Sequence, residues 1–178
     1  MVVPSAARME QALEPLIGLP LRSMGRVLDL EWFGFGRSRE VTARSGRTKI
    51  VEDWALHVQC AWRLSAPHCV ITGRHDLYYP AGDPEARSEG WSPFEEGARS
   101  RLDERTEQLL AAWEASPPVV NGVSADALGG IRLSLTNGHV LEVWPDDSVP
   151  REYWRLFEPY RDKSHFVVGG EHFEKLNR

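Results

Sequence analysis

Residues 54–64, WALHVQCAWRL, are the part of the sequence that most restricts what this chain can fold into. Apolar side chains occupy every second position of the stretch, whereas His57, Gln59 and Arg63 fall between them. Successive side chains of a β-strand point to opposite faces of a sheet, so this alternation predicts a strand with one buried face and one polar face. A fold that contains a β-sheet is therefore expected.

Several other segments have strand-like patterns, and recognisable turns join some of them. These segments are residues 26–35, 68–73, 119–124, 131–137, 139–145 and 165–170. The dipeptide Asn137-Gly138 is a strong signal for a hairpin between two of them. Another turn follows residue 64, and a hairpin symmetric about Ala66 would place Val70 opposite Trp62.

Two helices and one long loop are expected around these strands. Ser5 can cap a short N-terminal helix, because its hydroxyl can accept a hydrogen bond from the first turn. Residues 98–115 carry apolar side chains at helical spacing, which indicates a longer amphipathic helix. Pro, Gly, Asp and Ser interrupt residues 76–97, which predicts a long irregular loop. Its tip, between Gly82 and Gly90, is the expected first site of proteolysis.

Together these segments predict an α+β fold, with residues 1–178 as a single domain. The expected core is one antiparallel sheet of about six to eight strands, arranged as meanders and hairpins. The amphipathic helix and the short N-terminal helix would pack on it. A chain of 178 residues, 42% of them hydrophobic, is long enough to bury such a core without a disulfide or a metal ion.

The net charge, the N-terminal residues and the cysteines argue against several classes of protein. A formal net charge of −5 argues against a sequence-independent nucleic-acid binder, which needs Lys and Arg to neutralise phosphates. The N-terminus has no basic start followed by an unbroken apolar run, so neither a signal peptide nor a membrane span is expected. Cys60 and Cys69 face opposite ways in the expected hairpin. We therefore expect a cytoplasmic protein with two reduced thiols.

Potential metal ligands are crowded into residues 57–76, but their spacing does not fit a zinc site. They are His57, Cys60, His68, Cys69, His75 and Asp76. Zinc sites favour short motifs such as CxxC or HExxH, and a GxSxG nucleophile motif is also absent. Acid–base catalysis by His75 and Asp76 is less favoured than a turn in which Asp76 accepts hydrogen bonds from its neighbours. No metal, no cofactor and no catalytic residue is expected.

The C-terminal stretch EYWRLF poses a choice between a ligand pocket and a packed structural corner. Trp154 and Phe157 are three residues apart, which suits one helical turn with both rings in the core. Glu152 and Arg155 have the same spacing and would pair on its flank. The packed corner is favoured, because an arginine beside a tryptophan often stacks and pairs at the end of a sheet. His165 could contribute to either.

The C-terminal half also carries a recognisable signature. A hairpin ending in LEVW precedes E-x-W-R-x-F and a strand HFVV, through residues Asn137, Gly138, Leu141, Glu142, Val143, Trp144, Glu152, Trp154, Arg155, Phe157, His165, Phe166, Val167 and Val168. In this signature the chain resembles a widespread group of small, uncharacterised bacterial proteins. The resemblance implies a bacterial origin and supports the fold class, and it implies no particular activity.

Negative charge, the lack of a catalytic motif and a long aromatic loop favour a non-catalytic protein that binds a protein partner, as a small immunity or accessory protein does. The alternative is a small-ligand-binding protein or an enzyme, with its pocket between the 76–97 loop and the 152–165 corner. The candidate binding residues are Glu152, Trp154, Arg155, His165, His75, Asp76, Tyr78, Tyr79 and Trp91.

Overall fold

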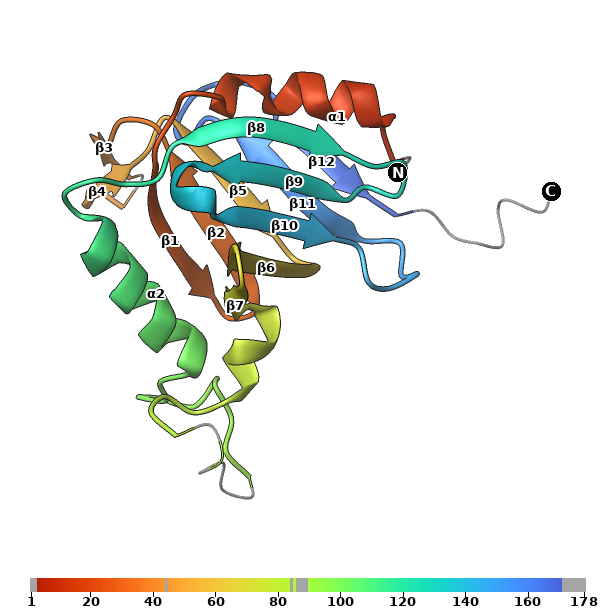
Figure 1. Ribbon diagram of the computed structural model, residues 1–178. Helices are drawn as coiled ribbons and strands as arrows, with labels where there is room; N and C mark the ends of the chain where they lie inside the picture. The colour runs from red at the N-terminus through yellow and green to blue at the C-terminus, as the bar shows by residue number, and fades with distance from the viewer. Residues whose placement is uncertain (1–2, 44, 84, 86–89, 171–178) are drawn as a thin grey trace.

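Two five-stranded antiparallel sheets pack face to face in the computed structural model, which describes residues 3–43, 45–83, 85 and 90–170 (Figure 1). The strands of the first sheet are, in spatial order, β1 (Leu21–Val27), β2 (Leu30–Phe35), β5 (Trp54–Val58), β11 (Glu152–Phe157) and β12 (Phe166–Gly169). Those of the second are β7 (Cys69–Gly73), β6 (Ala61–Ala66), β10 (Val140–Trp144), β9 (Ile131–Leu135) and β8 (Val120–Ala125).

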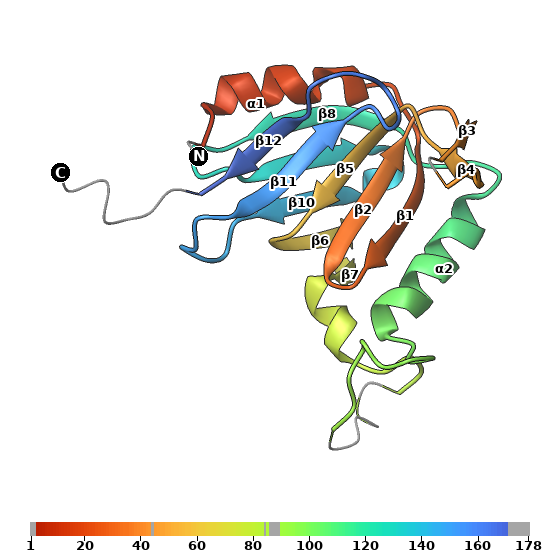
Figure 2. The same cartoon turned by 180° about the vertical axis from the view of Figure 1, so that it is seen from behind.

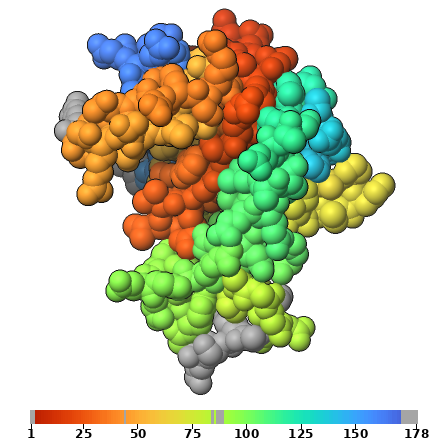
Figure 3. All heavy atoms as spheres, turned by 90° about the vertical axis from the view of Figure 1, so that its left-hand side faces the viewer, coloured from red at the N-terminus to blue at the C-terminus, as the bar shows by residue number. Residues whose placement is uncertain are grey.

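Helices cover the two open sides of this sandwich. The helix α1 (Ala6–Leu13) and the 3-10 turn η1 (Glu14–Leu16) lie along the side formed by β8 and β12 (Figures 1 and 2). Ser5 caps α1 as expected, since its hydroxyl accepts a hydrogen bond from Arg8 N. On the other side, α2 (Arg101–Trp113) contacts β1, β7 and the 3-10 helix η2 (Arg74–Tyr78) (Figure 3). The interior is therefore enclosed by both sheets and both helices.

The expected α+β fold with antiparallel pairing is confirmed, but the expected single sheet is wrong. The strands divide between two sheets and a separate ribbon of β3 (Arg39–Thr42) and β4 (Thr48–Val51), orange in Figure 3. The expected long helix over residues 98–115 is also wrong, because α2 is shorter at both ends. Ser100 Oγ accepts a hydrogen bond from Asp103 N at 3.2 Å, and the Asp103 carboxylate accepts one from Ser100 N at 2.8 Å. This capping box fixes where α2 begins.

The stretch at residues 54–64 forms two strands rather than one. The chain leaves the first sheet after β5 and enters the second sheet at β6. Gln59 N donates to the Tyr153 carbonyl at 2.8 Å, and Ala61 N donates to the Asp146 carboxylate at 3.1 Å. The inner faces of both sheets point into one core, so the alternation of apolar residues continues unbroken while the hydrogen-bonding partners change.

Aromatic side chains join the two sheets across the core. Trp62 of the second sheet meets Phe33 of the first edge-on, with ring centroids 5.2 Å apart and an interplanar angle of 83°. Trp154 of the first sheet is fully buried, as predicted, and its Nε1 donates to the carbonyl of Gly129, between β8 and β9, at 2.8 Å. These contacts specify how one sheet stacks on the other.

Residues 152–157 form strand β11, so the expected helical turn is wrong. The register of β11 against β12 shifts between Glu152 and Trp154, as in a β-bulge. Residues three apart normally point to opposite faces of a strand, but the extra residue of a bulge returns them to the same face. The spacing of Glu152 and Arg155 is therefore compatible with a bulged strand as well as with a helical turn. Backbone pairing with β5 and β12 makes this segment a strand.

One turn of the sheets is predicted by its local sequence, and another is not. The hairpin at Asn137-Gly138 is confirmed, with φ of 69° and 72° at these residues. The expected strand at residues 26–35 is instead the hairpin of β1 and β2, which turns at Leu28 with φ of 57°. Leucine rarely adopts this left-handed conformation, so the sequence carries no turn signal there.

The register of the β6–β7 hairpin also differs from the expectation. Val70 lies opposite Ser65, not Trp62, because the turn is tighter and a bulge follows it. Cys60 is buried, Cys69 is exposed, and both thiols are free. Burial raises the pKa of the Cys60 thiol to about 12.

Glu31 interrupts this apolar interior, because the residue is only 2% exposed. It lines a small space beside α2, and its Oε1 has no hydrogen-bond partner among the described residues. The nearby Arg26 donates instead to both oxygens of Asp103, at 2.7 and 2.9 Å. Arg74 donates to the Asp29 carboxylate at 3.2 Å. Burial therefore raises the pKa of Glu31 well above its ordinary value.

Replacing Trp154 with Ala is expected to lower the free energy of unfolding by about 3 to 5 kcal/mol, because the change leaves a large cavity and removes a buried hydrogen bond. Urea unfolding measures this. Trp144→Ala is the matched control, since Trp144 is 37% exposed and its loss should have a much smaller effect. Equal unfolding midpoints for Trp154→Ala and wild type would contradict the assigned packing.

Replacing Glu31 with Gln is expected to change how stability depends on pH. The unfolded chain ionises this carboxyl above about pH 4.3, whereas the folded protein keeps it protonated to a higher pH. The wild-type free energy of unfolding therefore falls as pH rises through this window, by up to about 1.4 kcal/mol per pH unit from this group. Urea unfolding near pH 5 and pH 8 should show a gain in the variant that grows with pH. A gain independent of pH would refute the assignment.

Candidate functional site

Three of the candidate residues, Glu152, Arg155 and His165, lie together on the outer face of the first sheet, the face toward the viewer in Figure 2. Arg155 Nε and Nη2 donate to the two oxygens of Glu152 at 2.5 and 2.6 Å. Gln59 Nε2 donates to the same carboxylate at 3.2 Å. Trp154 points the other way, into the core, so the expected packing of Arg155 against it is wrong.

An aromatic stack continues this group of side chains. The ring of Phe157 stacks on His165 with centroids 4.3 Å apart, and it meets His57 edge-on at 4.7 Å. Burial lowers the pKa of His57, and the Arg155 guanidinium lowers it further. The carboxylate, the guanidinium and the rings of this corner thus mainly contact one another, which leaves few polar atoms for a ligand.

The lowered pKa of His57 predicts a loss of stability at acidic pH. The unfolded chain binds a proton at this imidazole below about pH 6.5, and the folded protein does so only at lower pH. The free energy of unfolding should therefore fall as pH drops below this value, and His57→Gln should reduce that fall. NMR titration of the imidazole gives the pKa directly. Arg155→Gln should raise it, and an unchanged pKa would rule out the charge contribution.

The other candidate residues lie around η2 and the segment after it. The Asp76 carboxylate accepts hydrogen bonds from Thr72 Oγ1 at 2.9 Å and from Gly73 N at 3.3 Å, so the turn expected for it is confirmed. His75 is exposed and lies edge-on to Tyr78, with centroids 6.3 Å apart. Asp76 is held at the start of the long loop by its own turn and by Arg101 Nε of α2, 3.7 Å from its carboxylate.

The rest of the loop is partly attached to the body. Tyr79 is 40% exposed, and its carbonyl accepts a hydrogen bond from Arg101 N at 2.8 Å. Trp91 is half-buried. The expected proteolysis site falls mostly on residues 84 and 86–89, which lie outside the described residues. The loop extends beyond η2 and α2, whereas the corner lies on β11 and its neighbours, so the structure does not bring these two candidate groups together (Figure 2).

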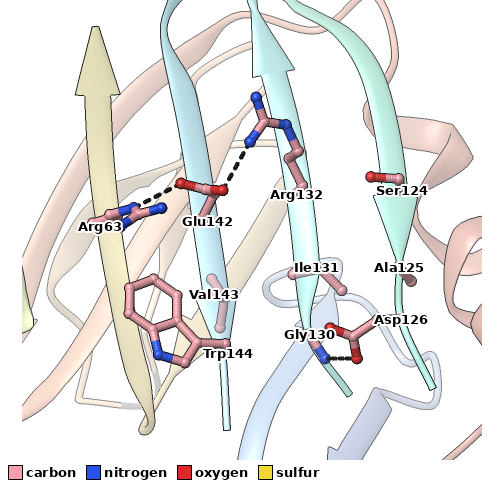
Figure 4. A pocket seen from close by; sticks show the side chains of 10 residues that line it. All are labelled: Arg63, Ser124, Ala125, Asp126, Gly130, Ile131, Arg132, Glu142, Val143 and Trp144. Atoms are coloured by element: carbon pink, nitrogen blue, oxygen red, sulfur yellow. Dashed lines mark hydrogen bonds and ion pairs between the residues drawn. The ribbon is translucent and has the colours of Figure 1, made fainter. Parts of the chain in front are cut away.

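A shallow groove of about 540 Å³ crosses the outer face of the second sheet (Figure 4). Strand register places Arg63 of β6, Glu142 of β10, Arg132 of β9 and Ser124 of β8 in one row across its floor. Trp144 lies beside this row, next to Arg63 (Figure 4). We call this surface the Trp144 groove.

A second hollow of about 370 Å³ adjoins the Trp144 groove and shares Arg63 and Trp144 with it. The candidate residues His75 and Asp76 line this hollow, and so does Val70, which is 60% exposed. Two of the residues expected at a site thus border a concave surface, although their neighbours there come from β6 and β10 rather than from the corner.

The two arginines in the groove share one carboxylate. Glu142 Oε2 accepts from Arg63 Nε at 2.7 Å, and Oε1 accepts from Arg132 Nη1 at 2.8 Å. Hydrogen bonding to Arg63 lowers the pKa of Glu142, so this carboxylate stays ionised. The Arg63 guanidinium also lies over the Trp144 ring, 5.2 Å from its centroid. These contacts hold both guanidinium groups and the indole in place.

The sequence places Arg63 on the polar face of its strand, and the Asn137-Gly138 turn places the segments of Arg132 and Glu142 side by side. The register that sets Arg132 opposite Glu142 comes from the three-residue connection Thr136–Gly138, because a loop of Asn137 and Gly138 alone would set Arg132 opposite Val143. β6 lies on the other side of β10 from β9. This position depends on the order of the strands in the sheet, and no local sequence pattern indicates it.

Comparisons with known proteins add no assignment. No family model, no curated protein and no solved structure matches this chain. Within the part of the chain that the structure describes, no three His, Cys, Asp or Glu side chains could together hold a metal ion. None of the described helices is long and apolar enough to cross a membrane. The resemblance to small bacterial proteins stays a prediction.

Proposed function

We propose that this is a protein-binding domain of the immunity or accessory kind, and that its partner binds across the Trp144 groove. The observation that carries the proposal is a 37% exposed tryptophan beside two arginines whose side chains are 47% and 50% exposed. Tryptophan and arginine are the residues that most often dominate binding energy in protein interfaces. An indole that stays in contact with water contributes little burial free energy. A partner that covered the Trp144 ring would gain the free energy of removing this ring from water.

The surroundings of Trp144 support this proposal. Val70 adds a second exposed apolar side chain in the adjoining hollow. The ion pairs of Glu142 with Arg63 and Arg132 provide polar groups next to these apolar ones, which is the usual composition of a transient interface. A bacterial, cytoplasmic setting is part of the proposal, and the exposed free thiol of Cys69 suits a reducing compartment.

The alternative is a small-ligand-binding protein or an enzyme. Sites for small ligands are concavities that enclose most of the ligand surface, with a few polar groups that converge on it. Among the described residues, the 76–97 loop and the 152–165 corner lie apart, which does not support a pocket between them (Figure 2). The Trp144 groove lies open along a sheet face (Figure 4). Its shape favours a protein surface over an enclosed ligand.

The test is affinity capture from the native host with the wild-type chain and Trp144→Ala, followed by identification of the partner and binding measurements with the purified pair. Trp144→Ala is expected to weaken binding about 30-fold, as the loss of a central interface tryptophan does. Arg155→Gln is the matched control on the other sheet and should bind like the wild type. Unfolding midpoints would verify that all three chains are folded.

Two outcomes would contradict the proposal. Binding that Arg155→Gln abolishes and Trp144→Ala leaves intact would place the site at the corner on the first sheet. If a purified partner bound all three chains equally, the binding site would lie away from both surfaces.

A further inference from the structure

The two arginines of the Trp144 groove have unused hydrogen-bond donors. A guanidinium carries five N–H groups. Arg63 engages only its Nε, and Arg132 only its Nη1, in hydrogen bonds with described residues. The remaining donors belong to side chains that are about half exposed, so they are accessible from the groove.

Within their row, Arg63, Arg132 and the ionised Glu142 carry a net charge of 2 − 1 = +1, on a chain whose formal charge is −5. Asp126 also lines the groove, at the end beside Gly130, where its carboxylate accepts hydrogen bonds from Leu128 N and Gly130 N (Figure 4). The shared carboxylate and the contact with Trp144 already restrict both arginines. Binding to preorganised side chains sacrifices less conformational entropy than binding to mobile ones.

We propose that the groove receives an aspartate or glutamate side chain of the partner between Arg63 and Arg132, with an apolar side chain of the partner on Trp144. This inference rests on the proposed function and names the chemistry of the partner. Guanidinium groups bind carboxylates through paired, charge-assisted hydrogen bonds. A single carboxylate neutralises the charge of +1 in the row of Arg63, Glu142 and Arg132, whereas a phosphate, with its charge near −2, would leave an excess of negative charge beside Glu142.

The strand geometry also sets the spacing of the two partner residues. Glu142 and Trp144 are two residues apart on β10, which separates their positions by about 7 Å. An extended partner segment that runs along the strand repeats its side chains at the same interval. The acidic residue and the apolar residue of the partner should therefore be two positions apart in its sequence.

Selection from a random peptide display library, with the full wild-type chain as bait, tests this without knowledge of the natural partner. Enriched peptides are expected to pair Asp or Glu with an aromatic or large aliphatic residue two positions away. A synthetic peptide of this kind should lose about tenfold in affinity on Arg132→Gln and little on Arg155→Gln. Its Asn or Gln analogue should bind weakly and be insensitive to Arg132→Gln.

The outcomes separate the inference from the proposed function. Peptides that require Trp144 but lack acidic residues, or whose affinity is unaffected by Arg132→Gln, would overturn the inference and leave the groove as a protein site. A phosphoserine peptide that binds more tightly than its glutamate counterpart would reassign the arginines to a phosphate. Failure to enrich any peptide that depends on Trp144 would count against both.

Discussion

The packing of two sheet faces against each other is the constraint on which the rest of this structure depends. The chain changes sheet between β5 and β6, yet Leu56, Val58, Cys60, Trp62 and Leu64 all remain buried. This is possible because both inner faces border one apolar interior, where burial is the dominant stabilising contribution. Phe33 against Trp62, and Trp154 against the β8–β9 turn, then set the relative placement of the sheets.

That packing leaves two outer sheet faces in water, and the two differ in chemistry. On the first, Glu152 and Arg155 neutralise each other, and the adjacent rings stack. On the second, a single carboxylate serves two arginines and a tryptophan stays partly exposed. The polar groups of the first face mostly bind one another. The second face retains hydrogen-bond donors that no described residue uses, together with exposed apolar surface. This asymmetry is why the proposed binding site lies on the second sheet.

Glu31 departs from the otherwise consistent burial pattern. Its carboxyl is buried beside α2 while the nearest arginines bind other carboxylates. An acid with a buried oxygen that has no hydrogen-bond partner among the described residues opposes stability, and well-ordered proteins usually confine such features to a few positions. Burial raises the pKa of this carboxyl, so its ionisation connects the stability of the α2 side of the sandwich to pH.

Local sequence patterns determined the alternating burial of residues 54–64, the strands at residues 131–144, the Asn137-Gly138 turn and the N-terminal helix, because each depends on neighbours close in the chain. The division into two sheets, the strand identity of residues 152–157 and the row formed by Arg63, Glu142 and Arg132 were decided by tertiary structure. Strand order and bulges arise from pairing between distant segments, and periodicity does not encode the identity of the partner. The Trp144 groove depends on that pairing, so the sequence alone indicated His75 and Asp76 of the adjoining hollow but not the groove itself.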